Sequence, residues 1–219
     1  GQDWIVLRYA EVLLNKAEAL AMENWNKNSA EALLALNDVR ARVGLPARSR
    51  DEVRSFLGDG YKVLMEKACG GADSADALKY FTEYYAVHLE DNTAPYPGVT
   101  DALAALAAKG RKMAVVSNKG YDAVQVLCGR FFAPHVTLYY GVSDTLKKKP
   151  APDMLLAAMR DLHSDAEDCV MVGDGEPDIA MARAAGIDII SVTWGFRTKE
   201  QLEKAGGTLF LAKSKMHAV

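Results

Sequence analysis

The sequence has little of what marks a disulfide-rich, nucleic-acid-binding or membrane protein. Its 219 residues include three cysteines (Cys69, Cys128 and Cys169) and no C-x-x-C spacing, so neither a disulfide framework nor a zinc site is indicated. A formal net charge of -3 offers no basic surface for nucleic acid. No apolar run has the length of a membrane span, and the first residues show no signal-peptide pattern. We therefore expect a protein of the reducing cytoplasm without a nucleic-acid or membrane partner.

The sequence does contain enough apolar material for a full core. Half of the residues are hydrophobic, which suffices for an α/β core and one small accessory domain. From Tyr96 onward, strand and helix patterns alternate, with Thr100 expected to cap the first helix and Gly110 and Gly186 expected to end helices. Strands are predicted at 112–116, 136–142, 169–172 and 187–193, and helices at 100–109, 121–129, 152–161 and 178–185. This alternation predicts βαβ units and a parallel sheet.

The stretch C-V-M-V-G-D-G-E-P-D at 169–178 reads as a buried strand, a tight loop and the start of a helix. Asp174 then stands at the carboxyl end of a strand, where open α/β sheets bind their ligands. Asp174 and Asp178 are four residues apart, so both carboxylates can converge on a hard cation such as Mg²⁺. The alternative is that Asp178 favours the helix N-terminus and Asp174 makes a turn.

Two other predicted strand ends carry polar residues. Ser117 and Asn118 follow the strand at 112–116, and Lys149 precedes the helix at 152–161. A hydroxyl, an ammonium and a carboxylate pair at successive strand ends suit a phosphoryl group, because phosphoryl transfer depends on positioning and charge stabilisation. Taken singly, Ser117 and Asn118 could form a helix cap, and Lys149 could be one of three solvated lysines.

The first 92 residues predict helices. The apolar spacing from Ile5 to Leu20 predicts one amphipathic helix, and a second follows from Asn28 to Val43, so that residues 4–43 form a helical hairpin. In the block at 49–92, Ser49 and Glu52 make a capping box, and aromatic residues that include Tyr84 fall at helical spacing and are interpreted as core.

Six further stretches carry a resemblance to a known family: V-R-S-F-L-G-D-G at 53–60, P-Y-P-G-V at 95–99, A-V-V-S-N-K at 114–119, K-P-A-P-D at 149–153, V-G-D-G-E-P-D at 172–178 and W-G-F at 194–196. Together they resemble the haloacid dehalogenase superfamily, and within it the phosphoglycolate phosphatase-like branch. The resemblance implies that Ser117 and Asn118 bind phosphate, that Lys149 is the conserved basic residue, with Ser117 and Lys149 catalytic, and that Asp174 and Asp178 form the magnesium site. It also implies that residues 45–92 are a helical cap.

A second resemblance concerns the beginning of the chain. L-R-Y-A-E-V-L-L-N-K-A-E-A-L at 7–20 and A-L-N-D-V-R-A-R-V-G-L-P at 35–46 resemble a segment of SusD/RagB outer-membrane glycan-binding proteins. In that family such a hairpin is a scaffold piece, so no glycan site is implied. The hairpin is expected to stand in place of the first strand and its loop.

The sequence departs from the dehalogenase superfamily at one motif. Those enzymes begin with a strand that ends in D-x-D-G-T, whose first Asp is the nucleophile and whose second is the general acid. No such motif occurs, and an alignment of Ile5 to Leu7 with that strand puts Arg8 and Ala10 at the two acidic positions. Loss of a nucleophile predicts a fall in rate on the order of 10⁶.

These observations define a set of expectations. The fold is a haloacid dehalogenase-like α/β fold with a parallel sheet and a helical cap, divided into a hairpin at 1–44, a cap at 45–92 and a core at 93–219. The function is that of a magnesium-dependent phosphomonoester phosphatase acting on a small phosphorylated metabolite, catalytically crippled because the nucleophile motif is absent. The alternative is a non-catalytic binding protein that uses the phosphatase body as a scaffold. The substrate and the oligomeric state do not follow from the sequence.

Overall fold

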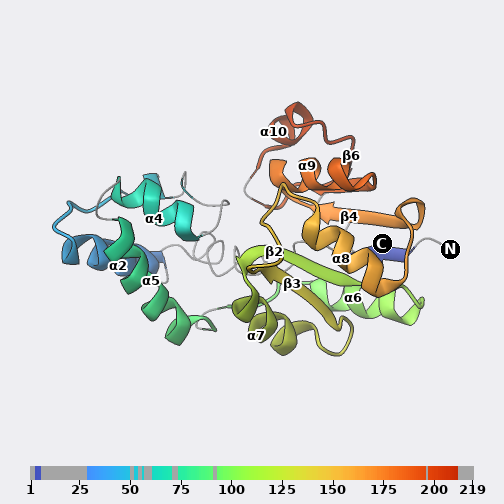
Figure 1. Ribbon diagram of the computed structural model, residues 1–219, viewed down its shortest axis with the longest axis horizontal. Helices are drawn as coiled ribbons and strands as arrows, with labels where there is room; N and C mark the ends of the chain where they lie inside the picture. Colours follow the sequence, from blue (N-terminus) through green and yellow to red (C-terminus); the bar gives the residue numbers. More distant parts are fainter. Residues whose placement is uncertain are drawn as a thin grey trace. The chain divides into compact units, whose positions relative to one another are not determined.

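The chain falls into two compact units. A computed structural model describes residues 3–5, 29–49, 52–53, 56, 61–70, 74–90, 93–195 and 197–211 (Figure 1). One unit, here named the α/β unit, takes in residues 1–15 and 94–219, and the other, the helical unit, takes in residues 16–93.

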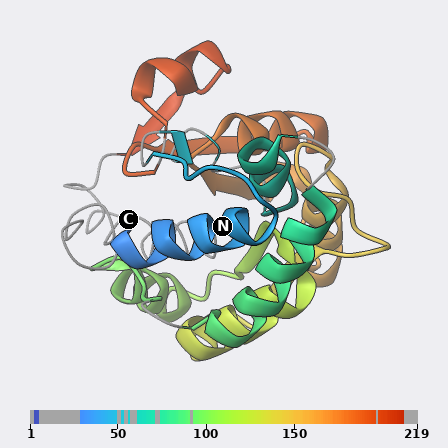
Figure 2. The ribbon, with the colours of Figure 1, turned by 90° about the vertical axis from the view of Figure 1, so that its left-hand side faces the viewer.

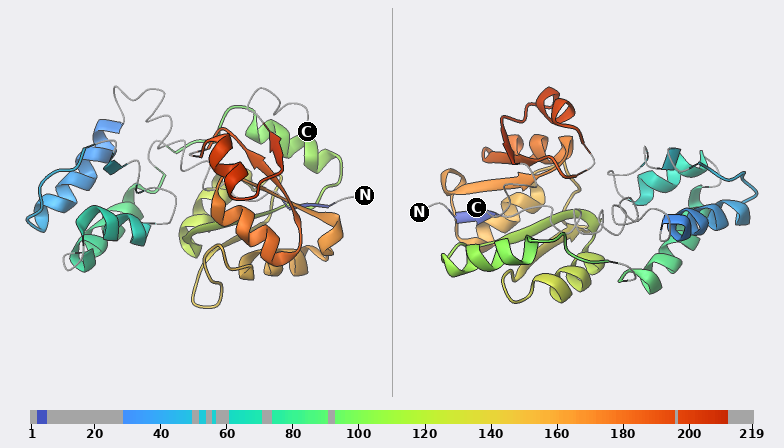
Figure 3. Two further views of the ribbon diagram at one scale, coloured as in Figure 1. Left: turned by 90° about the horizontal axis from the view of Figure 1, so that it is seen from above. Right: turned by 180° about the vertical axis from the view of Figure 1, so that it is seen from behind.

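All strand pairings given for the α/β unit are parallel. One sheet has the order β1-β4-β5-β6, formed by Asp3–Ile5, Cys169–Gly173, Asp188–Val192 and Leu209–Leu211. Strands β2 (Ala114–Gly120) and β3 (Leu138–Val142) form a second, two-stranded sheet. The parallel α/β architecture predicted from the alternating pattern is therefore confirmed, and Figure 3 shows the strands from two further directions.

Helices separate these strands along the chain. They are α6 (Val99–Ala108), α7 (Tyr121–Phe132), α8 (Asp153–Leu162), the 3₁₀ turn Ala166–Asp168, α9 (Glu176–Ala185) and α10 (Lys199–Lys204). Gly110 and Gly186 follow helix ends with φ of 71° and 73°, as predicted. The predicted cap at Thr100 is wrong. Gly98, with φ of 87°, is the N-cap of α6, and the helix has already begun at Val99.

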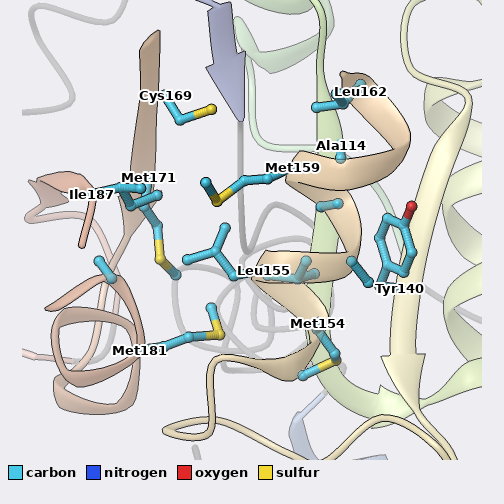
Figure 4. Packing of buried hydrophobic residues seen from close by; sticks show 14 residues of the cluster. Ala114, Tyr140, Met154, Leu155, Met159, Leu162, Cys169, Met171, Met181 and Ile187 are labelled. Atoms are coloured by element: carbon cyan, nitrogen blue, oxygen red, sulfur yellow. The ribbon is translucent and has the colours of Figure 1, made fainter. Parts of the chain in front are cut away.

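The core of the α/β unit joins the two sheets through α8. Leu155 and Met159 of α8 belong to one cluster with Ala114 and Val116 of β2 and Met171 of β4 (Figure 4). Helix α9 adds Met181 and Ala182 to the same cluster. Because these side chains are almost fully buried and in mutual contact, the cluster fixes the carboxyl ends of β2 and β4 relative to each other.

The N-terminal prediction requires a correction. Asp3–Ile5 is a strand that pairs with β4, with Asp3 opposite Cys169 and Ile5 opposite Met171, so the helix predicted to begin at Ile5 is wrong there. The apolar positions from Ile5 onward match a helical period. A helical period in the sequence does not show whether a short segment pairs with a neighbouring strand instead. Residues 6–28, which carry the remainder of that predicted helix, lie outside the described residues.

The helical unit contains α2 (Ser29–Arg42), α4 (Tyr61–Cys69) and α5 (Ser74–His88), and α5 packs on both of the others (Figure 2). The capping box is confirmed, because the Glu52 carboxylate accepts from the Ser49 backbone N–H at 2.9 Å. The core interpretation of Tyr84 is wrong, since this side chain is 48% exposed. The buried apolar residues of the unit are Leu36, Val39, Met65, Ala68, Cys69 and Ala77.

Candidate functional site

The turn between β4 and α9 is organised by Asp178. Its Oδ2 accepts hydrogen bonds from the backbone N–H groups of Asp174, at 3.2 Å, and Gly175, at 3.0 Å. The carboxylate is fully buried, and a Cβ added to Gly173 would lie 2.5 Å from the Asp178 Cβ, so the turn closes tightly over it. Asp178 therefore satisfies N–H groups at the start of α9, which is the helix-terminus role that the sequence left open.

The other oxygen of Asp178 binds Lys149. The Lys149 Nζ donates to Asp178 Oδ1 at 3.0 Å, and both side chains have zero exposure. Removing two charges from water costs several kcal/mol for each ion, and such a pair persists when its geometry is good and its remaining groups are hydrogen-bonded. The backbone N–H groups at Oδ2 meet that condition on the carboxylate side. Two sequence-predicted site residues, 29 positions apart, are thus in direct contact.

Strand β2 contributes the next contact. Asn118 Oδ1 accepts from the Lys149 backbone N–H at 2.7 Å, and the Ser117 Oγ accepts from the Lys119 backbone N–H at 3.2 Å. Both side chains are buried. The helix-cap interpretation of Ser117 and Asn118 is wrong, because α7 has Gly120 as its N-cap and makes no side-chain cap hydrogen bond. Asn118, Lys149 and Asp178 instead form one hydrogen-bonded chain from the end of β2 to the turn after β4.

Asp174 is covered by a segment that sequence reasoning did not select as part of the site. A Cβ added to Gly195 would lie 2.0 Å from Asp174 Oδ2 and 2.5 Å from its Cγ, so the backbone that follows β5 packs directly on this carboxylate. Asp174 is 2% exposed. The glycine of W-G-F at 194–196 was the available signal, since a close backbone approach requires a residue without a side chain.

The predicted magnesium site has a limited set of ligands. Both oxygens of Asp178 already accept hydrogen bonds, so Asp174 is the better placed carboxylate for a cation. Within the described ranges, no three His, Cys, Asp or Glu residues form a group that could hold a metal. Mg²⁺ needs only one or two protein carboxylates when waters and a substrate phosphate complete its shell, so the residues fit a weakly held ion. Arg8 and Ala10 lie outside the described residues.

Comparison with known proteins gives matches over most of the chain. The sequence model described as haloacid dehalogenase-like hydrolase matches residues 27–192. A phosphoglycolate phosphatase of Colwellia psychrerythraea is 30% identical over 211 residues, which cover 91% of this chain and 92% of that protein. A phosphoglycolate phosphatase of Chromobacterium violaceum is 32% identical over 171 residues, covering 74% and 77%. A solved structure from Lactobacillus delbrueckii subsp. bulgaricus, named as a proposed phosphoglycolate phosphatase, has a TM-score of 0.77 and 30% identity and covers 88% and 92%.

The same comparisons give no support to the SusD/RagB resemblance. The dehalogenase match already begins at residue 27 and so includes the second half of the segment at 4–46. The Colwellia protein also covers nearly all of the chain. The resemblance was based on two short stretches at 7–20 and 35–46, and the amphipathic helical pattern of such stretches is common to many folds. From its fold, its matched length and its relatives, the chain belongs to the haloacid dehalogenase-like hydrolases.

Proposed function

We propose that the chain is a magnesium-dependent phosphomonoester phosphatase of the phosphoglycolate phosphatase-like kind, acting on a small phosphorylated metabolite and catalytically crippled in the printed sequence. The observation that carries the proposal is the buried chain of contacts from Asn118 through Lys149 to Asp178. A buried cation held at the carboxyl end of a parallel sheet suits a phosphate dianion. The relatives named phosphoglycolate phosphatase support the substrate class.

Each site residue has a distinct proposed task. The Ser117 hydroxyl, whose oxygen accepts from the Lys119 N–H, can turn its proton toward a phosphate oxygen. The Lys149 ammonium supplies positive charge and donates to Asp178, while Asn118 accepts from the Lys149 backbone N–H and so positions the backbone of this residue. Asp174 would hold Mg²⁺, which when bound neutralises charge on the phosphoryl oxygens. Residues 45–92 are proposed as the cap that selects the substrate.

The printed sequence lacks the residue that would attack phosphorus. No D-x-D-G-T motif occurs. In the alignment of Ile5 to Leu7 with the first strand of the family, Arg8 occupies the position of the nucleophile, and an arginine cannot form an acyl phosphate. Binding of phosphate can persist without that step.

Turnover of p-nitrophenyl phosphate with Mg²⁺ tests the proposal. The wild-type chain is expected to show no rate above that of an Asp174→Ala control. The double variant Arg8→Asp with Ala10→Asp restores both acidic positions and is expected to gain an Asp174-dependent rate. An Asp174-dependent rate in the wild type would show that the predicted loss of activity is wrong. No gain in the double variant, together with no phosphate binding by the wild type, would contradict the phosphatase site itself.

A second candidate function is binding without turnover. It is favoured by one observation, the coexistence of an absent nucleophile motif with a buried and connected polar network. The contacts within the network satisfy the groups that make it, so the network can persist in a protein that binds an anion without turnover. Saturable binding of a phosphorylated metabolite that is recovered intact, and is weakened by Ser117→Ala, would favour this candidate.

The compartment is proposed from the cysteines. Cys69, Cys128 and Cys169 are free and buried, which suits a reducing cytoplasm. Among the helices that the structure describes, no candidate membrane span was found.

A further inference from the structure

One partly exposed ion pair joins the two segments that flank Asp174. The Arg197 Nε donates to Glu176 Oε2 at 2.7 Å and to Oε1 at 3.0 Å. Glu176 is the first residue of α9, two positions after Asp174. Arg197 lies two positions after Gly195, whose backbone packs on the Asp174 carboxylate. The Glu176–Arg197 pair therefore links the backbone that carries Asp174 to the backbone that covers it.

The segment after β5 is also fixed on both sides of this contact. Thr193 donates its backbone N–H to the Leu211 carbonyl of β6 at 3.1 Å. At the other side, Thr198 caps α10 and exchanges hydrogen bonds with Gln201. Between these anchors, the ion pair at Arg197 is a side-chain contact that ties the segment to the Asp174 turn. An arginine suits this task, since its charge persists at all working pH values and its planar group is pre-organised.

We propose that Glu176 and Arg197 are positioning residues that keep the Gly195 backbone seated against Asp174 and thereby fix the orientation of its carboxylate for Mg²⁺. The Mg²⁺ part rests on the proposed function. The positioning of the Gly195 backbone against Asp174 does not rest on the proposed function, because it is argued from the observed contacts alone. A carboxylate held in one orientation binds a cation more tightly than one that must be ordered on binding.

Calorimetric titration with Mg²⁺ tests the metal part. We compare the wild-type chain with Glu176→Gln, Arg197→Gln and the double variant. Each single variant is expected to bind Mg²⁺ about 2- to 5-fold more weakly, the range for an ion pair of this exposure. The double variant is expected to be no weaker than the weaker single variant, because both changes break one interaction. Arg197→Lys, which keeps the charge, is expected to recover part of the loss.

The matched control is Glu203→Gln. It removes the same charge from a residue of α10 whose carboxylate pairs with Lys199 at 3.3 Å, and it leaves the Glu176–Arg197 pair intact. Its Mg²⁺ affinity is expected to equal that of the wild type. A loss equal to that of Glu176→Gln would mean that net charge alone is responsible, and the proposal would be overturned.

Hydrogen exchange without metal separates the two ideas. In Glu176→Gln and Arg197→Gln, amides of the peptide 193–198 are expected to exchange about 2- to 5-fold faster than in the wild type and in Glu203→Gln. If the wild type binds no Mg²⁺ but exchange accelerates, the metal part of the proposed function fails and the positioning role stands. If exchange and Mg²⁺ affinity are both unchanged in the variants, the positioning role fails.

A direct role of Arg197 in anion binding predicts a different pattern. With inorganic phosphate as the probe, Arg197→Gln would then weaken binding while Glu176→Gln, which releases the guanidinium, would strengthen it or leave it unchanged. Equal effects of the two variants support positioning through the pair. Opposite effects would overturn it.

Discussion

The buried ion pair of the α/β unit differs from the ion pairs described in the helical unit. In the α/β unit, Lys149 and Asp178 are distant in sequence, and both are fully buried. In the helical unit, the ion pairs Asp38–Arg42 and Arg48–Glu52 are four residues apart along the chain, with side chains 35–65% exposed. An exposed pair contributes little, whereas a buried pair must be matched by further hydrogen bonds. Convergent chemistry therefore arises where the sheet brings distant strand ends together.

The apolar clusters of the two units also differ, in size and in the elements that form them. The main cluster of the α/β unit joins side chains from both sheets, α8 and α9. Among the residues that the structure describes, the cluster of the helical unit is smaller and comes from α2, α4 and α5. A small core supports a lower opening free energy, because less apolar surface is removed from water. We therefore expect the helical unit to open more readily than the α/β unit.

Breaking the buried Lys149–Asp178 pair is expected to have the largest effect on stability. Asp178→Ala leaves the Lys149 ammonium buried without its carboxylate and frees two backbone N–H groups of the turn, so unfolding in urea should become about 3–5 kcal/mol easier. Asp38→Ala, which breaks an exposed pair of the helical unit, should cost at most about 1 kcal/mol. Circular dichroism during the titration measures both.

A double variant serves as the control for this prediction. Lys149→Met with Asp178→Leu replaces the pair by apolar side chains and should be less destabilised than Asp178→Ala, because no charge remains buried. If Asp178→Ala and Asp38→Ala cost the same, the contrast between the units is wrong.

The next effect concerns the packing around Asp174. In Gly195→Ala the new methyl group would collide with the carboxylate, so the segment after β5 must shift at a cost of about 1–3 kcal/mol. Gly129→Ala in α7 meets no atom within 4 Å and should be neutral or stabilising by up to about 1 kcal/mol. Thermal unfolding of the two variants compares a closely packed part of the α/β unit with an open one. If Gly195→Ala does not change the stability within error, the segment after β5 can move away from Asp174 without cost, and the prediction is wrong.

Thiol alkylation compares the two units within one molecule. Cys69 lies in the helical cluster, whereas Cys128 and Cys169 lie in the α/β unit, and all three are buried. Burial raises the pKa of the Cys128 thiol to about 12, so at pH 8 it stays protonated and reacts only after opening. Peptide mapping after iodoacetamide treatment should find Cys69 modified at least about tenfold faster, which corresponds to about 1.4 kcal/mol in opening free energy. Faster modification of Cys128 would reverse the comparison.

The smallest effect lies in the local contacts of the helical unit. Hydrogen bonds from the Ser49 hydroxyl, the Ser49 backbone N–H and the Arg48 side chain lower the pKa of Glu52 from 4.5 to about 2. Because the folded value is the lower one, the contact contributes stability above pH 4.5 and loses it as the pH falls toward 2. An NMR titration of the Glu52 carboxyl should show a midpoint clearly below 4.5, and Ser49→Ala should raise it. Equal midpoints in both proteins would mean that the capping box is not formed in solution.

Features that depend on neighbouring residues in the chain could be predicted from the sequence. Apolar runs located β4 and the first part of β2, and the glycines at 110 and 186 gave two helix ends. The predicted end of β2 at 116 is wrong, because the strand continues through Ser117 and Asn118 to Gly120. The carboxylate at position 178 was identified because its spacing from Asp174 fits one turn. These features depend on neighbours in the chain, so their signals are local.

Contacts between residues that are distant in the chain could not be predicted from the sequence in the same way. The strand at Asp3–Ile5 forms because β4 offers a free edge, which no local period reports. The contact between Lys149 and Asp178 assigns both oxygens of the carboxylate to protein donors, whereas the spacing alone suggested a shared cation. The packing of Gly195 on Asp174 likewise requires knowledge of where the segment after β5 returns.

The pairing of β1 with β4 also bears on how the chain acquires its fold during synthesis. Asp3 emerges from the ribosome 166 residues before its partner Cys169. The helices at 29–42, 61–69 and 74–88 need only near neighbours and can form in the meantime. The first strand must therefore wait, exposed to other chains and to chaperones, until the fourth arrives. Closure of the sheet at β1 is expected to be a late event in folding.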